Sequence, residues 1–238
     1  MTTKIDCLPL LNYIKEYGPI PDDYVSIDIE ASGLGERDLP LQIGWCIVKN
    51  RKPIVEVSHV IDWTSYLKSN EVEDLAKRMD DTRKKMDSKG YSYPWTIKML
   101  KTRGKHPKEV AKKLFETIDN QYLVAHYGWM FDYPVIGKYL SKYGNYNFSP
   151  DQSLLLDTGI LVKSMLVSVS PSKGEPYHTY LKRIHSINTG HKHSVTACLD
   201  IFGLNSKGVN KSATHDSGYD SWLVHLILES LREKSNVK

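Results

Sequence analysis

The sequence contains little cysteine and no long apolar run. Its 238 residues include three cysteines, Cys7, Cys46 and Cys198, which are odd in number and widely spaced. This usage argues against a disulfide framework and is typical of reduced thiols in a cytosolic protein. The most apolar stretch, 154–169, is interrupted by Asp157 and Lys163, so no membrane span is predicted. The first residues lack the apolar core of a signal peptide, and we therefore expect a cytoplasmic protein with no membrane partner.

Neither sign of charge dominates the composition. The chain has 32 Lys and Arg against 28 Asp and Glu, which gives a formal net charge of +4. This small excess permits a polyanionic partner without requiring one. A chain of this length can bury roughly 70–75% of its unfolded surface, so it can fold without a disulfide or zinc staple. Because the sequence shows no internal repeat and no shift in composition, we expect a single domain over residues 1–238.

Apolar periodicity predicts strands and helices in alternation. Residues 25–30 alternate, with Val25, Ile27 and Ile29 on one face and Asp28 and Glu30 on the other. Further strands are predicted at 42–48, 53–61, 122–125 and 154–156, and helices at 72–86, 107–118, 134–143, 193–202 and from 216 onward. Three strands in succession, followed by alternating helices and strands, predict an α/β fold with a central mixed five-stranded sheet flanked by helices.

The segment 168–193 does not fit this alternation. It contains two prolines, two glycines and four histidines. Because proline and glycine interrupt regular elements, we predict an irregular insertion here.

Two acidic residues occupy one face of the first predicted strand. Asp28 and Glu30 are two positions apart, so their side chains start roughly 6.5–7 Å from each other. Two carboxylates at this separation can bind a shared hard cation. The alternative is an ordinary solvated strand face, although the flanking Ile27 and Ile29 argue against full exposure.

Three later residues have the chemistry to join this pair. Asp132 follows a short apolar strand, and an Asp two residues before Pro134 is equally a good helix N-cap. His215 ends a polar loop at 205–214, and Asp220 lies about one turn into the following helix. Each of them alone is explained as well by a cap or a surface loop.

In chain order these residues resemble the motifs of DEDDh-type 3′→5′ exonucleases, the proofreading exonucleases of the ribonuclease H-like superfamily. The segment 28–33, Asp-Ile-Glu-Ala-Ser-Gly, is similar to the first motif of the family, with Ser32 in place of the usual Thr. His215 with Asp220 is similar to the third motif. The resemblance runs from about Tyr24 to Leu231 and implies a ribonuclease H-like fold.

The second motif matches less closely. The segment 124–126, Val-Ala-His, followed by Phe131 and Asp132, resembles it, with Tyr127 where Asn is usual and with one extra residue before Asp132. The segment 156–158, Leu-Asp-Thr, is similar to a further Asp-Thr segment of the family.

The resemblance implies hydrolysis assisted by two cations. Asp28, Glu30, Asp132 and Asp220 would be the ligands of two divalent ions, and all-oxygen ligation favours Mg²⁺ or Mn²⁺ over zinc. His215 would be the general base that takes a proton from the attacking water, since its ordinary pKa of about 6.5 is near working pH.

The implied substrate is the 3′ end of a nucleic acid, with single-stranded DNA favoured and RNA as the alternative. A polymerase or a second copy of the chain is a further candidate partner, and the sequence does not decide between them. The side chains expected to contact the substrate follow the first two motifs: Ser32, Gly33, Leu34, His126, Trp129 and Phe131.

Three other interpretations stay open. A basic stretch would grip phosphates or form a solvated helix face: Lys98, Lys101, Arg103, Lys105, Lys108, Lys112 and Lys113. A small zinc site is conceivable at four residues with loose spacing: His185, His191, His193 and Cys198. A catalytically silent module that binds nucleic acid on the same fold is the third.

Overall fold

Five strands form one mixed sheet at the centre of the computed structural model, which describes residues 5–33, 35, 37–90, 92–149, 154–204, 209 and 215–235. The strands are β1 (Tyr24–Ala31), β2 (Pro40–Lys49), β3 (Lys52–Val60), β4 (Leu123–Ala125) and β5 (Leu155–Asp157), in the spatial order β3-β2-β1-β4-β5. β1 pairs antiparallel with β2, and β2 with β3, whereas β1, β4 and β5 run parallel. The predicted α/β class and mixed five-stranded sheet are confirmed.

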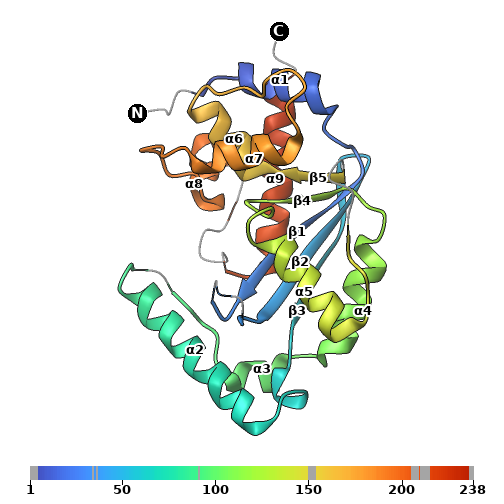
Figure 1. Cartoon of the computed structure of the whole chain (residues 1–238), viewed down its shortest axis with the longest axis vertical. Coiled ribbons are helices and arrows are strands. Elements are labelled where there is room, and N and C mark those ends of the chain that lie inside the picture. Colours follow the sequence, from blue (N-terminus) through green and yellow to red (C-terminus); the bar gives the residue numbers. More distant parts are fainter. Residues whose placement is uncertain are drawn as a thin grey trace.

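Helices cover both faces of the sheet (Figure 1). One layer consists of α1 (Leu8–Tyr17), α6 (Thr158–Leu166), α7 (Tyr177–Ser186), α8 (Val195–Ile201) and α9 (Ser217–Ser235). The other side carries η1 (Trp63–Ser65), α2 (Ser69–Asp87), α3 (Ile97–Arg103), α4 (Pro107–Ile118), α5 (Asp132–Tyr139) and the π-helical turn η2 (Leu140–Gly144). No helix among the described residues is long and apolar enough to cross a membrane.

The alternation of β1 separates two cores. Val25, Ile27 and Ile29 belong to the core shared with α4 and α5, while Tyr24 belongs to the core beneath α9. The even-numbered side chains of β1 therefore point toward α9, as period-two geometry requires. This arrangement directs Asp28 toward the last helix of the described chain.

The prediction of an irregular segment at 168–193 is wrong for ten of its residues, which form α7. Tyr177, Tyr180, Leu181 and Ile184 recur at helical spacing, and the last three are buried. The signal was present in the sequence, but the proline and glycine residues that flank α7 outweighed it. Sequence reasoning also missed α6, whose residues Thr158–Met165 are all buried, so that no amphipathic period exists to detect.

Candidate active site

β1 and β2 present their polar side chains to the N-terminal end of α9. Asp28 is paired in register with Gly44 of β2, and Glu30 with Gln42. Gly44 is in turn opposite Ser58 of β3, so these positions form neighbouring rows across the sheet. The N-terminus of α9 lies directly over these rows.

Gly44 is what allows α9 to approach so closely. A Cβ atom placed on Gly44 would lie 2.0 Å from the carbonyl carbon of Ser217 and 2.1 Å from the backbone nitrogen of Gly218. Gln42 completes the contact, because its Oε1 accepts a hydrogen bond from the Ser217 amide (3.0 Å) and its Nε2 donates to Asp216 Oδ2 (3.0 Å). The sheet thereby fixes the start of α9 and the two residues, His215 and Asp220, that the helix end carries.

Three of the four predicted carboxylates meet at this point. Each of Asp28, Glu30 and Asp220 offers an oxygen, and these oxygens all lie within 4.8 Å of one another. Oδ2 of Asp220 accepts the His215 amide at 2.9 Å, whereas its buried Oδ1 has no hydrogen-bond partner among the described residues. A buried carboxylate oxygen without a partner is costly. The donor set and this unpartnered oxygen fit a divalent cation that prefers oxygen ligands.

Asp132 adjoins the cluster from α5. Its charge raises the pKa of Asp28, and Glu30 in turn raises that of Asp132, so the carboxylates interact although Asp132 is outside the 4.8 Å group. The alternative role as an N-cap is wrong, because α5 begins at Asp132 itself and the cap position is Phe131. Backbone groups of Asp132 itself and of Ile29 in β1 oppose the rise in the pKa of this carboxylate.

Burial and mutual repulsion dominate the electrostatics. Burial, followed by the charges of Asp132, Asp220 and Glu30, raises the pKa of Asp28 well above its ordinary value. Burial is also the main cause that raises the pKa of Asp132 to about 8 and that of Asp220 to about 6. The site therefore holds protons, or binds cations, at neutral pH.

This cluster makes the stability of the cation-free protein depend on pH. The pKa of Asp132 is about 8 in the folded protein and roughly 3.9 in an unfolded chain. Between these values the folded state binds more protons, so the free energy of unfolding falls as the pH rises. We expect the thermal midpoint in EDTA to fall between about pH 6 and about pH 8, to fall less in Asp132→Asn, and to recover with Mg²⁺. An identical pH dependence of the two proteins in EDTA would contradict this.

His215 faces the cluster from a left-handed backbone position, with φ +77°. Its Nδ1 lies 3.6 Å from Glu30 Oε1, and this contact is the main cause that raises the pKa of His215. The side chain is 39% exposed, and its Nε2 has no hydrogen-bond partner among the described residues. The imidazole is thus oriented by one nitrogen and accessible at the other. The predicted loop before it, 205–214, lies outside the described residues except for Val209.

Asp157 holds the second-motif loop in place. Its carboxylate accepts hydrogen bonds from the amides of Tyr127 (2.9 Å), Trp129 (3.3 Å) and Ile160 (3.0 Å), and burial raises its pKa to about 6. One buried carboxylate therefore joins the loop after β4 to the start of α6.

His126, a predicted substrate contact, makes its hydrogen bonds inside the protein. Its Nδ1 lies 3.0 Å from Thr158 Oγ1 and its Nε2 lies 2.8 Å from the carbonyl oxygen of His193. Burial lowers the pKa of His126 to about 4. A neutral ring with its proton on Nε2 fits both contacts, because the carbonyl can only accept. The ring links β4 to α6 and to the end of the 168–193 segment.

Tyr127, the residue that departs from the family motif, extends this link. Its hydroxyl lies 2.9 Å from His193 Nδ1, and burial lowers the pKa of His193, so the neutral ring accepts the bond. We expect Tyr127→Phe to lose about 1 kcal/mol of unfolding free energy and to speed proteolysis within 168–193. Urea unfolding measures the first effect and timed trypsin digestion the second. Tyr122→Phe, at an exposed tyrosine, is the control, and equal losses in both variants would contradict the link.

Ser32, directly after β1, is held by hydrogen bonds to Asp38 and Leu39. Ser32 is fully buried; its hydroxyl donates to Asp38 Oδ1 (2.8 Å) and accepts the Leu39 amide (3.0 Å). A Cβ atom on Gly33 would lie 2.6 Å from Asp38 Oδ2, so the Asp38 side chain would have to move to admit it. The hydroxyl of Ser32, a predicted substrate contact, therefore has its hydrogen-bond partners within the protein. Leu34, the next predicted contact, lies outside the described residues.

A cleft of about 630 Å³ opens beside Glu30, between this loop and α2. Gly33 and Phe131 line it, and both also line an adjoining recess of about 150 Å³. Trp129 lines neither; it is half-buried and packs against both cores. Of the two aromatic candidates, the structure thus places Phe131 at the cleft and Trp129 in the packing behind it.

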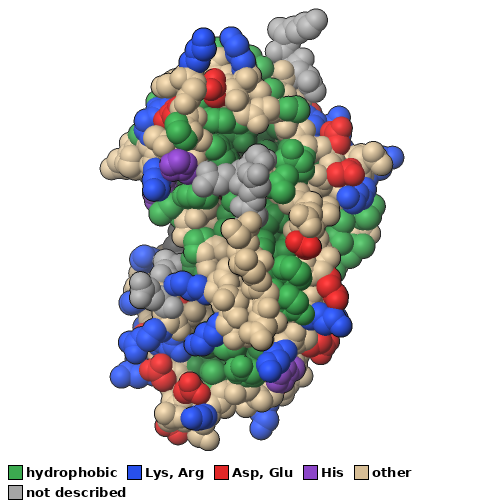
Figure 2. Space-filling view, turned by 45° about the vertical axis from the view of Figure 1, so that its right-hand side comes forward, with side chains coloured by type: hydrophobic (Ala, Val, Ile, Leu, Met, Phe, Trp, Pro, Cys, Tyr) green, Lys and Arg blue, Asp and Glu red, His purple; other side chains and the backbone are tan. Residues whose placement is uncertain are grey.

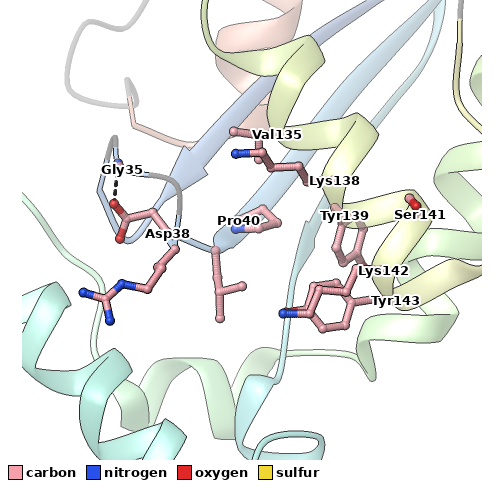
Figure 3. A pocket seen from close by; sticks show the side chains of 11 residues that line it. Gly35, Asp38, Pro40, Val135, Lys138, Tyr139, Ser141, Lys142 and Tyr143 are labelled. Atoms are coloured by element: carbon pink, nitrogen blue, oxygen red, sulfur yellow. Dashed lines mark hydrogen bonds between the residues drawn. The ribbon is translucent and has the colours of Figure 1, made fainter.

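A third cavity, of about 310 Å³, lies between the loop after β1 and the α5–η2 segment (Figure 3). Lys138 and Lys142 line it opposite Asp38 and Pro40, and a hydrogen bond from the Gly35 amide to Asp38 Oδ2 (2.6 Å) shapes the loop. Gly35 and Asp38 line all three cavities, so the cavities adjoin along this loop.

The structure also bears on the other sequence interpretations. The only candidate metal group within the described part of the chain is Asp28, Glu30 and Asp220, so the four-residue zinc site is not assembled. Lys113 and Lys112 of the basic stretch pair with acidic residues of their own helix. This pairing favours a solvated face on α4.

Sequence reasoning missed Gln42, Gly44 and Asp216. Gln42 and Gly44 are on the same strand face, two residues apart, which is the one signal the sequence carries. Their partners are some 175 positions away and become visible only in the fold.

No protein-family model matches the sequence, and no curated protein sequence matches it. Solved structures of exonuclease I are similar in fold. A zinc-bound complex of the E. coli enzyme with single-stranded DNA superposes with a TM-score of 0.55 at 13% identity, over 90% of this chain and 41% of that one. A further exonuclease I structure gives 0.57 at 13% identity with the same coverage. The E. coli enzyme with a dT13 oligonucleotide gives 0.52 at 14% identity, over 87% of this chain and 40% of that chain.

These likenesses define the class of fold. The mixed five-stranded sheet with helices on both faces is a ribonuclease H-like fold, as the sequence resemblance implied. The chain spans about two fifths of the length of the exonuclease I chains that it matches.

Proposed function

We propose that this protein is a metal-dependent 3′→5′ exonuclease that removes nucleotides from the 3′ end of a nucleic acid, with single-stranded DNA favoured. One observation carries the proposal: Asp28, Glu30 and Asp220 offer oxygens within 4.8 Å of one another, with the imidazole of His215 beside Glu30. The fold shared with exonuclease I, two of whose structures contain single-stranded DNA, supports it.

Four carboxylates would hold two cations, Mg²⁺ or Mn²⁺: Asp28, Glu30, Asp132 and Asp220. When bound, the cations would position the scissile phosphate and stabilise charge on the attacking and leaving oxygens. The raised pKa values of Asp28 and Asp132 support this assignment, because repulsion between buried carboxylates is relieved by a cation.

His215 is proposed to take the proton from the attacking water. Its Nδ1 faces Glu30, which leaves Nε2 to accept a proton. The exposure of the ring suits a base that meets water and substrate. Phe131, at the cleft, is proposed to stack on the terminal base, and Gly33 to let the substrate backbone approach the loop.

The test is digestion of matched 5′-labelled DNA and RNA oligonucleotides with Mg²⁺, with EDTA, and with Asp28→Ala in Mg²⁺. Stepwise shortening of DNA in the first reaction alone is the expected result. Faster shortening of RNA would instead identify an exoribonuclease. Binding without shortening in every reaction would overturn the proposal and favour a silent nucleic-acid-binding module.

Two further assignments belong to the proposal. Residues 1–238 would act as one exonuclease domain in the cytoplasm. A polymerase or homodimer partner stays a candidate.

A further inference from the structure

The chain makes a long excursion between β3 and α4, which we call the α2 arm (residues 62–104, with η1, α2 and α3). Its base is closed by backbone hydrogen bonds from Asp62 to Lys105 and from Lys105 to Val60, both 2.9 Å. In Figure 1 the arm extends below the sheet, and α2 stands across from the end of β1. The α2 arm therefore lies beside the acidic cluster and is separate from the sheet.

Three contacts join the α2 arm to the end of β1 and to the residues that follow it. Thr82 Oγ1 donates to the Ser32 carbonyl (2.6 Å), and the Tyr93 hydroxyl donates to the Ala31 carbonyl (3.2 Å). Arg78 lies 3.6 Å from Asp38. Because these contacts are made to residues 31–38, which directly follow Glu30, they hold the α2 arm beside the acidic cluster.

One face of α2 and the turn after it line the cleft of about 630 Å³ whose other side includes Glu30: Arg78, Asp81, Thr82, Lys85 and Met86 on the helix and Lys89 in the turn. The spacing of three and four residues places the helix side chains on one face. Lys and Arg side chains gather along the lower left of the molecule in Figure 2, the side on which α2 lies in Figure 1.

Lys85 and Lys89 combine two properties: like Lys77 they make no ion pair within the described part of the chain, and unlike Lys77 they line the cleft. Arg78, Arg83 and Lys84 each pair with an aspartate of the same helix. Lys85 and Lys89 are exposed and make no ion pair with any described residue. They are on the cleft, so they suit an anionic occupant.

We propose that Lys85 and Lys89 bind backbone phosphates of a single nucleic-acid strand, in the nucleotides that precede the 3′-terminal one. This inference rests on the proposed function and extends it from the reacting end to the strand behind that end. The cleft volume is that of a site for one small ligand, roughly 300–1,000 Å³, which suits one strand. Met86 and Phe131 provide apolar surface for its bases.

The test compares two double variants of equal charge. Lys85→Gln/Lys89→Gln removes the cleft cations, and Lys68→Gln/Lys77→Gln removes two exposed lysines of the same arm that do not line the cleft. Binding of a fluorescein-labelled dT12 is measured in EDTA by anisotropy, across a range of salt concentrations. Circular dichroism melts check that both variants fold.

We expect the cleft variant to bind about tenfold more weakly at low salt, and the control within about twofold of wild type. Each phosphate contact contributes about 0.7 to the slope of log Kd against log salt for single strands, so the slope of the cleft variant should fall by about 1.4. With Mg²⁺, the KM for dT12 should rise about tenfold with kcat within about twofold, because the lost contact is remote from the reacting bond. A dinucleotide should be cut equally by wild type and variant.

The outcomes separate the two proposals. If both double variants lose dT12 binding equally, or if neither loses it, the proposal that Lys85 and Lys89 bind phosphates is overturned. This holds whatever the nuclease assay shows. If the wild type binds dT12 through Lys85 and Lys89 but does not shorten it, the exonuclease proposal is overturned and the phosphate-binding proposal stands.

Discussion

Replacing Asp28 by asparagine should reduce kcat/KM for a 3′-labelled oligonucleotide by at least about 10³-fold, roughly 4 kcal/mol of transition-state stabilisation. The amide keeps the shape of the side chain but removes the negative charge at the centre of the cluster, within 4.8 Å of Glu30 and Asp220 oxygens. Less negative charge weakens cation binding, and repulsion among the remaining carboxylates also falls. The same substitution should therefore raise the thermal midpoint of the protein in EDTA.

A lower kcat/KM together with a higher thermal midpoint in EDTA distinguishes a cation site from a structural carboxylate. Loss of a merely structural acid would lower both activity and stability. Asp119→Asn, at an exposed acidic residue beyond α4, is the matched control and should change neither. Retained cutting by Asp28→Asn at saturating Mg²⁺ would exclude the proposed centre.

Replacing Gly44 by alanine should have the largest effect on stability, a loss of at least about 3 kcal/mol. The added methyl group would lie 2.0 Å from the Ser217 carbonyl carbon, and the obstacle is backbone, which cannot rotate away. α9 must then move off the sheet, and it carries Asp220 with it. Urea unfolding and 3′-end digestion should therefore both show large losses.

Gly190→Ala is the control, because no atom lies within 4 Å of its added Cβ and the residue is exposed. A Gly44→Ala protein that unfolds at the wild-type urea concentration would show that α9 is not held at this contact.

Local pattern was sufficient to predict the strand that carries the first two carboxylates. Val25, Ile27 and Ile29 alternate with polar residues, and this period fixes which side of the sheet Asp28 and Glu30 occupy. The approach of Asp220 was predicted by resemblance to a family, not by periodicity. Its physical cause, the absence of a side chain at Gly44, depends on a contact between segments more than 170 residues apart.

Other features had no local signal. His126 has the same place in the sequence whether it meets a substrate or an internal carbonyl, and only the position of His193 decides between them. Lys85 and Lys89 stand among many charged residues in and just after α2, and what distinguishes them, their position on the cleft beside Glu30, emerges only in the fold. Pairing across the fold, which sets these roles, is absent from any short window of the chain.

The position of α9 has a consequence for biosynthesis. Asp28, Glu30 and Asp132 leave the ribosome well before His215 and Asp220, and α9 packs against β1, β2 and β3 only afterwards. A nascent or prematurely terminated chain therefore lacks the assembled centre and leaves one side of its sheet bare. A chain truncated before α9 therefore exposes the apolar surface that this helix covers, and such surface favours aggregation.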